Sequence, residues 1–181
     1  MLLNTSHSSL LIVDIQERLL PAMHEPERVL AKTSILLKAA ETLKIPVTVS
    51  EQYPKGLGRT VPQLATNSTV TFQKLSFSCW RDAAMKAHFI SHHDAGRPFV
   101  IVAGIEAHVC VLQSCIDLHN AGFGVFAVAD AMSSRKTEST DLAFARMQSA
   151  GIQMLNSEMV IFELLEKAGS AEFKALSALI R

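Results

Sequence analysis

Residues 99–110 read Phe-Val-Ile-Val-Ala-Gly-Ile-Glu-Ala-His-Val-Cys, an apolar run that breaks at Gly104 and then becomes amphipathic. The part Phe99–Ala103 is typical of a buried strand. Gly104–Ala107 predicts a short turn, and His108–Asn120 predicts a helix that ends before a glycine. A strand that leads through a tight turn into a helix is half of a β-α-β unit.

The same alternation of short apolar runs and amphipathic stretches continues on both sides of this unit. The other predicted strands are Leu10–Val13, Val47–Ser50, Val70–Gln73, Val125–Ala129 and Ile152–Leu155. The other predicted helices are Pro26–Lys44, Trp80–His93, Thr137–Ser149, a helix capped by Ser157 that runs to Lys167, and a tail helix after Ser170. We therefore expect a three-layer α/β/α, Rossmann-like fold with a six-stranded, mostly parallel sheet. One domain over residues 1–181 is expected, with a core at about 9–167 and the tail helix at about 170–181.

Composition excludes several classes of protein. The 181 residues are 49% hydrophobic, and 17 basic residues balance 17 acidic ones. Balanced charge argues against a nucleic-acid or anionic-membrane partner, and no apolar run approaches the ~18 residues of a membrane helix. Three cysteines without a close pair argue against a disulfide framework, and no targeting segment is visible at the N-terminus. A cytoplasmic protein is expected, with organelle import left open.

Polar residues follow the predicted strands, where ligands bind in open α/β sheets. Asp14, Lys74 and the segment up to Cys110 are three such exits, and an acid, a lysine and a thiol there could form a catalytic cluster. Helix amides beside Cys110 predict a lowered thiol pKa and could also stabilise an oxyanion. Each residue has a plainer interpretation: a buried core cysteine, a cap at Asp14, a surface lysine at position 74.

Three motifs together resemble the isochorismatase-like cysteine hydrolases, which include nicotinamidases and N-carbamoylsarcosine amidohydrolases. They are Leu-Leu-Ile-Val-Asp14-Ile-Gln16, Lys74 after the third strand, and Gly104-Ile-Glu-Ala-His-Val-Cys110-Val. The resemblance spans about Ser9–Lys167, and the run from Glu51 to Pro62 looks most like the isochorismatase domain-containing subgroup.

This resemblance implies a mechanism. Cys110 would be the nucleophile, Asp14 the general base and acid, and Lys74 the group that lowers the thiol pKa. A non-proline cis peptide would fall at Ile105–Glu106 and direct the amides of Glu106 and Cys110 into one oxyanion hole. The implied reaction is hydrolysis of a small amide, carbamoyl or acyl substrate through a thioester.

Departures from other members narrow the expected function. The loop after the second strand has Gln52, Tyr53 and Pro54 in place of the metal-binding Asp-x-His of nicotinamidases, so no metal and no cofactor are expected. A cysteine at position 110 favours acyl chemistry over the vinyl-ether hydrolysis of true isochorismatases. The substrate pocket is expected to include four residues near the strand exits, which are otherwise ordinary core residues: Gln16, Tyr53, Phe77 and Trp80.

Three further patterns carry weaker hypotheses. His88 and His92 have the i, i+4 spacing of a metal clamp, but without a third ligand they favour a solvated face or subunit contact. His108 lies two residues before Cys110, which raises the hypothesis of a Cys-His dyad. Side chains two residues apart on a helix point in different directions, so a buried or interface histidine is favoured. Apolar residues of the C-terminal third predict a homo-oligomer: Met147, Met154, Met159, Ile161, Phe162 and Leu165. Vinyl-ether or ester hydrolysis by the same residues, and a non-enzymatic assembly module, stay open as alternatives.

Overall fold

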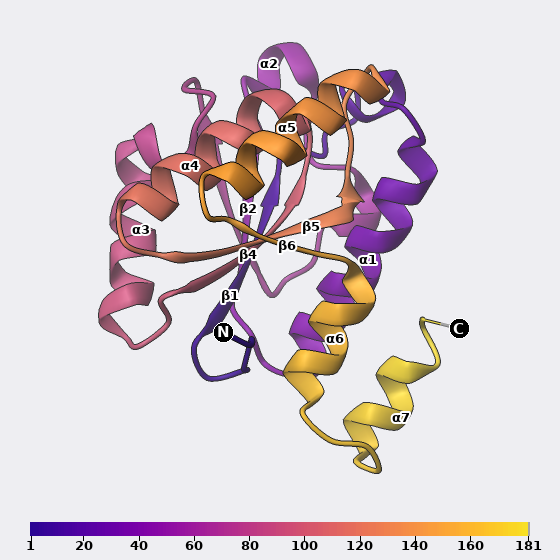
Figure 1. Ribbon diagram of the computed structural model, residues 1–181. Helices are drawn as coiled ribbons and strands as arrows, with labels where there is room; N and C mark the ends of the chain where they lie inside the picture. The colour runs from indigo at the N-terminus through magenta and orange to yellow at the C-terminus, as the bar shows by residue number, and fades with distance from the viewer. Residues whose placement is uncertain (181) are drawn as a thin grey trace.

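A six-stranded, entirely parallel sheet forms the centre of the molecule in the computed structural model, which describes residues 1–180 (Figure 1). The strand order is β3-β2-β1-β4-β5-β6. The strands are β1 Ser8–Val13, β2 Val47–Gln52, β3 Thr69–Lys74, β4 Phe99–Gly104, β5 Gly124–Met132 and β6 Gln153–Leu155. The expectation of an α/β fold with six strands is confirmed, and the sheet is parallel throughout rather than mostly so.

Helices cover both faces of this sheet, and two clusters of buried side chains lie between the layers. The helices α1 and α6 pack on one face, and α3, α4 and α5 pack on the other (Figure 1). The bounds are α1 Pro26–Thr42, α2 Pro54–Leu57, α3 Ala83–Asp94, α4 Leu112–Asn120, α5 Thr137–Ser149, α6 Ser157–Leu165 and α7 Ala171–Ser177. Single 3-10 turns occupy η1 Leu20–Ala22, η2 Pro62–Leu64 and η3 Cys79–Arg81. Within residues 1–180, no helix has both the length and the apolar character needed to cross a bilayer.

Several helix boundaries differ from the sequence prediction for local reasons. The predicted helix Trp80–His93 is divided into η3 and α3, because the Asp82 side chain caps α3 by accepting from the amides of Ala84 and Met85. Asn156, not Ser157, caps α6 by accepting from the amide of Met159 at 2.8 Å.

A helix follows Ser170 as predicted, and Ser170 caps it, since its Oγ accepts from the amide of Phe173 at 3.0 Å. That helix, α7, ends at Ser177, and position 181 of its predicted range lies outside the described residues.

The segment after β2 is more ordered than the predicted loop Glu51–Pro62. Strand β2 continues to Gln52, a single turn of helix (α2) follows, and Gln16 forms an antiparallel bridge with Thr60. These contacts return the chain to the end of β1, so the segment borders the same edge of the sheet as Asp14.

The strand order places a topological switch between β1 and β4. The chain adds β2 and β3 on one side of β1, and then adds β4, β5 and β6 on its other side. In open parallel sheets the crevice beyond the strand ends at this point is the usual ligand site. Asp14 follows β1 directly, and the turn to Cys110 follows β4.

Candidate active site

Asp14 and Lys74 form a fully buried ion pair at the carboxyl edge of the sheet. Lys74 Nζ lies 2.7 Å from Asp14 Oδ2, and both side chains are 0% exposed. Lys74 ends β3, so its long stem crosses the end of β2 to reach the aspartate that follows β1. Burial is the largest single influence and lowers the pKa of Lys74, but Asp14, Cys79 and Cys110 together outweigh it, and the net pKa is raised. The ammonium group is therefore charged beside Asp14.

Two further acceptors fix the Lys74 ammonium group. Lys74 Nζ donates to Gln52 Oε1 at 2.8 Å and to the Phe77 carbonyl at 3.1 Å. Gln52 is itself held, because its amide nitrogen donates to the Leu75 carbonyl at 2.9 Å. An ammonium group has three protons, and all three of them have acceptors here. Lys74 is thus positioned as a fixed charge.

The Asp14 carboxylate is also anchored through its other oxygen. Ser50 Oγ donates to Asp14 Oδ1 at 2.7 Å, and the Asp14 amide donates to the Ser50 carbonyl at 3.1 Å. Asp14 adopts a left-handed backbone conformation with φ of 52°, which turns its side chain out of the strand direction. Sequence analysis gave no role in the site to Ser50 or Gln52, although Thr48, Ser50 and Gln52 lie at every second position of β2 and so mark a polar face.

Cys110 lies in a π-helical turn, Ala107–Val111, that precedes α4, where the sequence predicted an ordinary first helical turn. Its side chain is buried, with 5% of the residue exposed. Burial raises the pKa of the Cys110 thiol, the Asp14 charge and hydrogen bond raise it further, and the Lys74 charge lowers it only in part. The expectation of a lowered thiol pKa is therefore wrong: at rest Cys110 is a neutral thiol beside a carboxylate and an ammonium group.

The turn between β4 and Cys110 is tightly packed against β1. Gly104 has φ of 131°, and a Cβ atom there would overlap the backbone of Val13. The next amide, of Ile105, donates to the Val13 carbonyl at 2.9 Å, and the Ile105–Glu106 peptide bond is cis. The amide of Glu106 has no acceptor within residues 1–180, which leaves this N–H free for a ligand.

The side chain of Glu106 has a separate role from its amide. Its carboxylate accepts from Arg135 Nε at 2.9 Å, and Arg135 is largely exposed. This ion pair connects the turn before Cys110 with the segment after β5.

A second cysteine, Cys79, belongs to the same polar network. Its Sγ donates to Ser50 Oγ at 3.6 Å, and its amide donates to Ser114 Oγ at 2.8 Å. Ser114 Oγ in turn donates to the Cys110 carbonyl at 2.6 Å. Burial raises the pKa of Cys79 to about 11, so Cys79 is a neutral donor behind Ser50.

The four residues expected in the substrate pocket have different locations. Gln16 is fully buried, and its amide binds the backbone of Gln52 and Gly58, so it fastens the segment after β2 and does not form a pocket wall. Trp80 packs edge-on against Phe123, with 5.6 Å between the ring centroids, and Lys86 Nζ lies over the indole. The indole has this position because η3 turns it toward α3. Neither residue lines the pocket beside Lys74, and their contact with a substrate stays a prediction.

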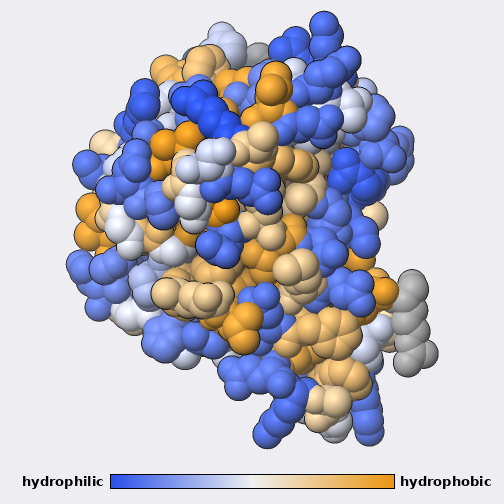
Figure 2. Space-filling view, in the orientation of Figure 1, coloured by the Kyte–Doolittle hydropathy of each residue, from blue (hydrophilic) through white to orange (hydrophobic). Residues whose placement is uncertain are grey.

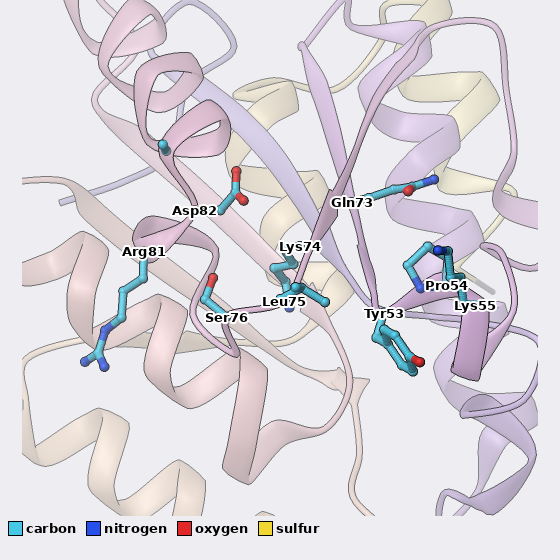
Figure 3. Close-up of a pocket in the computed structure, with 10 residues that line it drawn as sticks. Tyr53, Pro54, Lys55, Gln73, Lys74, Leu75, Ser76, Arg81 and Asp82 are labelled. Atoms are coloured by element: carbon cyan, nitrogen blue, oxygen red, sulfur yellow. The ribbon is translucent and has the colours of Figure 1, made fainter.

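Tyr53 and Phe77 remain at the surface near the site. Tyr53 is 50% exposed and lines a pocket of 510 Å³ together with Lys74, Leu75 and Arg81 (Figure 3). Tyr53 and Arg81 lie on either side of Lys74 in this view. Phe77 is 53% exposed and does not border the pocket. Asp14 and Cys110 do not line this pocket either, so it adjoins the polar cluster from the Lys74 side.

The histidines lie apart from this cluster. His88 Nε2 lies 2.9 Å from Thr48 Oγ1, and its ring centroid lies 4.3 Å from that of His92. Both side chains are half-buried, so they do not form a fully solvated face, and the alternative of a subunit contact stays a prediction. His108 Nδ1 lies 2.9 Å from Ser134 Oγ. Among the described side chains, no group of three or more His, Cys, Asp or Glu residues could hold a metal ion.

Comparison with known proteins places this arrangement in a family. A model described as the isochorismatase domain matches residues 8–159. The secreted isochorismatase effector Isc1 of Phytophthora sojae (strain P6497) is 35% identical over 181 residues, which is 97% of this chain and 85% of that protein. Isochorismatase domain-containing protein 2 of Danio rerio is 35% identical over 179 residues, which is 98% of this chain and 89% of that protein.

A solved structure shows the same architecture. The structure of MAR1 ribonuclease from Caenorhabditis elegans superimposes with a TM-score of 0.91 at 36% identity, covering 99% of this chain and 92% of that chain. The matched residues of the family model include Asp14, Lys74 and Cys110. The chain therefore belongs to the isochorismatase family.

Proposed function

We propose that this protein is a metal-independent cysteine hydrolase of a small amide, carbamoyl or acyl substrate. The observation that carries the proposal is the buried Asp14–Lys74 pair, whose two charges both act on the neighbouring Cys110 thiol. A carboxylate beside a neutral thiol is suited to take the thiol proton during attack on a carbonyl.

The proposed reaction proceeds in two balanced halves. Cys110 Sγ attacks the substrate carbonyl carbon while its proton passes to Asp14, and the oxyanion accepts hydrogen bonds from the amides of Glu106 and Cys110. Collapse of this intermediate breaks the bond to the leaving nitrogen, which takes the proton from Asp14 and leaves a thioester. Water then attacks the thioester, gives a proton to Asp14, and releases the acid as the proton returns to Cys110. Lys74 stays charged throughout, because its protons are committed to fixed acceptors.

A substrate panel tests this proposal. The panel contains primary amides, carbamoyl compounds, aryl esters, vinyl ethers and a single-stranded RNA oligonucleotide. We expect hydrolysis of a carbonyl compound by the wild type, undiminished by a metal chelator, and an acyl adduct on Cys110 detected by intact-protein mass spectrometry. Loss of both signals in Cys110→Ala is expected. Hydrolysis that survives this substitution, or depends on added metal, would sink the mechanism.

The RNA arm of the panel addresses the ribonuclease name of the solved relative. The formal net charge of this chain is zero, with 17 basic and 17 acidic residues. Because neutralising phosphates requires a basic excess, we infer a small-molecule substrate and no nucleic-acid partner. RNA cleavage that disappears in Cys110→Ala would replace the acyl substrate by a phosphodiester.

We also infer a homo-oligomer in which α6 forms part of the contact. Met147 and Ile161 are fully buried in the core and take no part, contrary to the sequence prediction. Met159 and Phe162 of α6 remain 46% and 44% exposed. Figure 2 shows apolar side chains gathered over the surface that α6 and α7 form. A second copy of the chain covering this surface would remove it from water.

A reducing compartment fits the cysteines. Cys79, Cys110 and Cys115 are all free and buried, and the proposed mechanism needs Cys110 as a thiol. We therefore propose a cytoplasmic location, which fluorescence microscopy of the tagged full chain in its own cell would test. Export of the tagged chain into the medium would contradict it.

A further inference from the structure

A second cavity lies on the face of the sheet opposite the Asp14–Lys74 pair. Side chains alternate along β2, so Ser50 and Gln52 face the ion pair while Val49 and Glu51 face the other layer. The cavity has a volume of 260 Å³ and is bordered by Val49, Glu51, Arg59, Leu64 and threonine side chains of β3. Nothing in the proposed hydrolysis uses it.

Glu51 is a buried carboxylate with only one oxygen satisfied. The residue is 3% exposed. Its Oε1 accepts from the amide and the hydroxyl of Thr60 at 2.8 and 3.0 Å. Its Oε2 is buried and has no hydrogen-bond partner within residues 1–180. A buried charge with an unsatisfied oxygen is costly, so this oxygen favours a ligand that donates hydrogen bonds and carries positive charge.

Arg59 brings the opposite charge to the same cavity. Its side chain is exposed and, within the described part of the chain, forms neither an ion pair nor a hydrogen bond. Arg59 and Glu51 therefore border one cavity without pairing with each other. A cation alone would pair with Glu51 but would be repelled by Arg59. An anion alone would pair with Arg59 but would be repelled by Glu51.

The walls between these charges are mixed. Val49 and Leu64 are buried and apolar, and Thr71 of β3 adds a methyl and a hydroxyl group at the cavity edge. A short carbon chain would contact the apolar walls while polar groups at its ends reach the two charges.

We propose that this cavity binds a small zwitterionic amino acid, with its ammonium group on Glu51 and its carboxylate on Arg59. The ammonium group supplies the donor that Glu51 Oε2 lacks, and the planar guanidinium can donate paired hydrogen bonds to a carboxylate. A single carboxylate with neutral hydroxyls is a poor match for a divalent metal, which favours several charged oxygens.

Isothermal titration calorimetry on the full chain tests this proposal with defined probes. Glycine, β-alanine and 4-aminobutyrate vary the distance between the two charges, while propylamine and butyrate carry one charge each. We expect saturable binding of at least one zwitterion and binding at least about tenfold weaker for both single-charge probes.

Three variants decide the assignment. Glu51→Gln keeps an oxygen acceptor for Thr60, and Arg59→Gln alters an exposed side chain, so both are expected to fold, as circular dichroism would verify. Each should weaken binding of the zwitterion by roughly tenfold or more. Arg146→Gln, which alters an exposed side chain on α5, should leave binding unchanged. No heat from any zwitterion at millimolar concentration, or equal binding by Glu51→Gln, would overturn the proposal. Its failure would leave the hydrolase proposal untouched, because Cys110 is not involved.

Discussion

Cys110, the proposed nucleophile, is a thiol that keeps its proton. Burial and the Asp14 carboxylate raise its pKa above the ordinary value of 9.0, and Lys74 offsets this only in part. The thiolate is therefore scarce near neutral pH, so in the proposed mechanism reactivity depends on Asp14 accepting the proton during attack. This differs from sites in which a helix end holds a free thiolate.

Alkylation by iodoacetamide tests whether Cys110 is a protonated thiol or a free thiolate. We expect Cys110 to be modified far more slowly near neutral pH than the exposed cysteine introduced by Ser91→Cys, because a raised pKa keeps the folded-state thiol protonated. The Cys110 rate should rise toward alkaline pH, as peptide mass spectrometry would record. Faster modification of Cys110 than of the introduced cysteine at neutral pH would contradict the raised pKa.

The Asp14–Lys74 pair makes a second prediction at the scale of residues. Lys74→Met leaves a buried carboxylate without its cation and should cost about 3–5 kcal/mol in the free energy of unfolding. Adding Asp14→Asn to it removes the unpaired charge, so the double variant should recover part of that loss. Urea unfolding of the two single variants and the double variant measures the coupling. Additive losses would show that the two side chains do not act as a pair.

At the scale of elements, the turn between β4 and α4 places Cys110. The turn can approach β1 only because position 104 has no Cβ: Val13 backbone atoms occupy that space. The Ile105 amide then bonds to the Val13 carbonyl, so the β1–β4 pairing and the position of Cys110 are linked.

Gly104→Ala tests this link against a matched glycine. The new Cβ would lie 2.6 Å from the Val13 nitrogen, so β1 and β4 must separate, and we expect a loss above 4 kcal/mol or failure to fold, roughly the range of severe core substitutions. Gly122→Ala also has a positive φ, of 96°, but its Cβ would meet nothing within 4 Å. It should cost only about 1–2 kcal/mol in thermal unfolding. Equal losses would mean that the close approach to Val13 is unimportant.

At the scale of the whole molecule, the exposed apolar surface of α6 predicts self-association. Phe162→Glu would place a charge in a contact formed by Met159 and Phe162 and should shift the protein toward monomer in multi-angle light scattering. Leu142→Glu is the matched control, because Leu142 is 72% exposed on α5, away from this surface. A wild-type chain that is monomeric at micromolar concentration, or an unchanged mass in Phe162→Glu, would contradict the predicted contact.

The sequence by itself determined the order of strands and helices, and it indicated Asp14, Lys74 and Cys110 as strand-end residues. Apolar periodicity, glycines and prolines act locally, so Phe99–Gly104 and Thr137–Ser149 are found with little or no error. Only the tertiary structure decided which polar groups meet. Ser50, Gln52 and Cys79 surround Asp14 and Lys74, and the hydrogen bonds of this group join residues 22 to 60 positions apart in the sequence. They also depend on the order of the strands in the sheet, which the sequence does not state. The same holds for the Cys110 pKa, because burial and the Asp14 carboxylate at the end of β1 raise it more than the Lys74 charge lowers it. The local pattern of apolar residues determines the helices and strands, whereas desolvation and charge pairing are properties of the packed molecule.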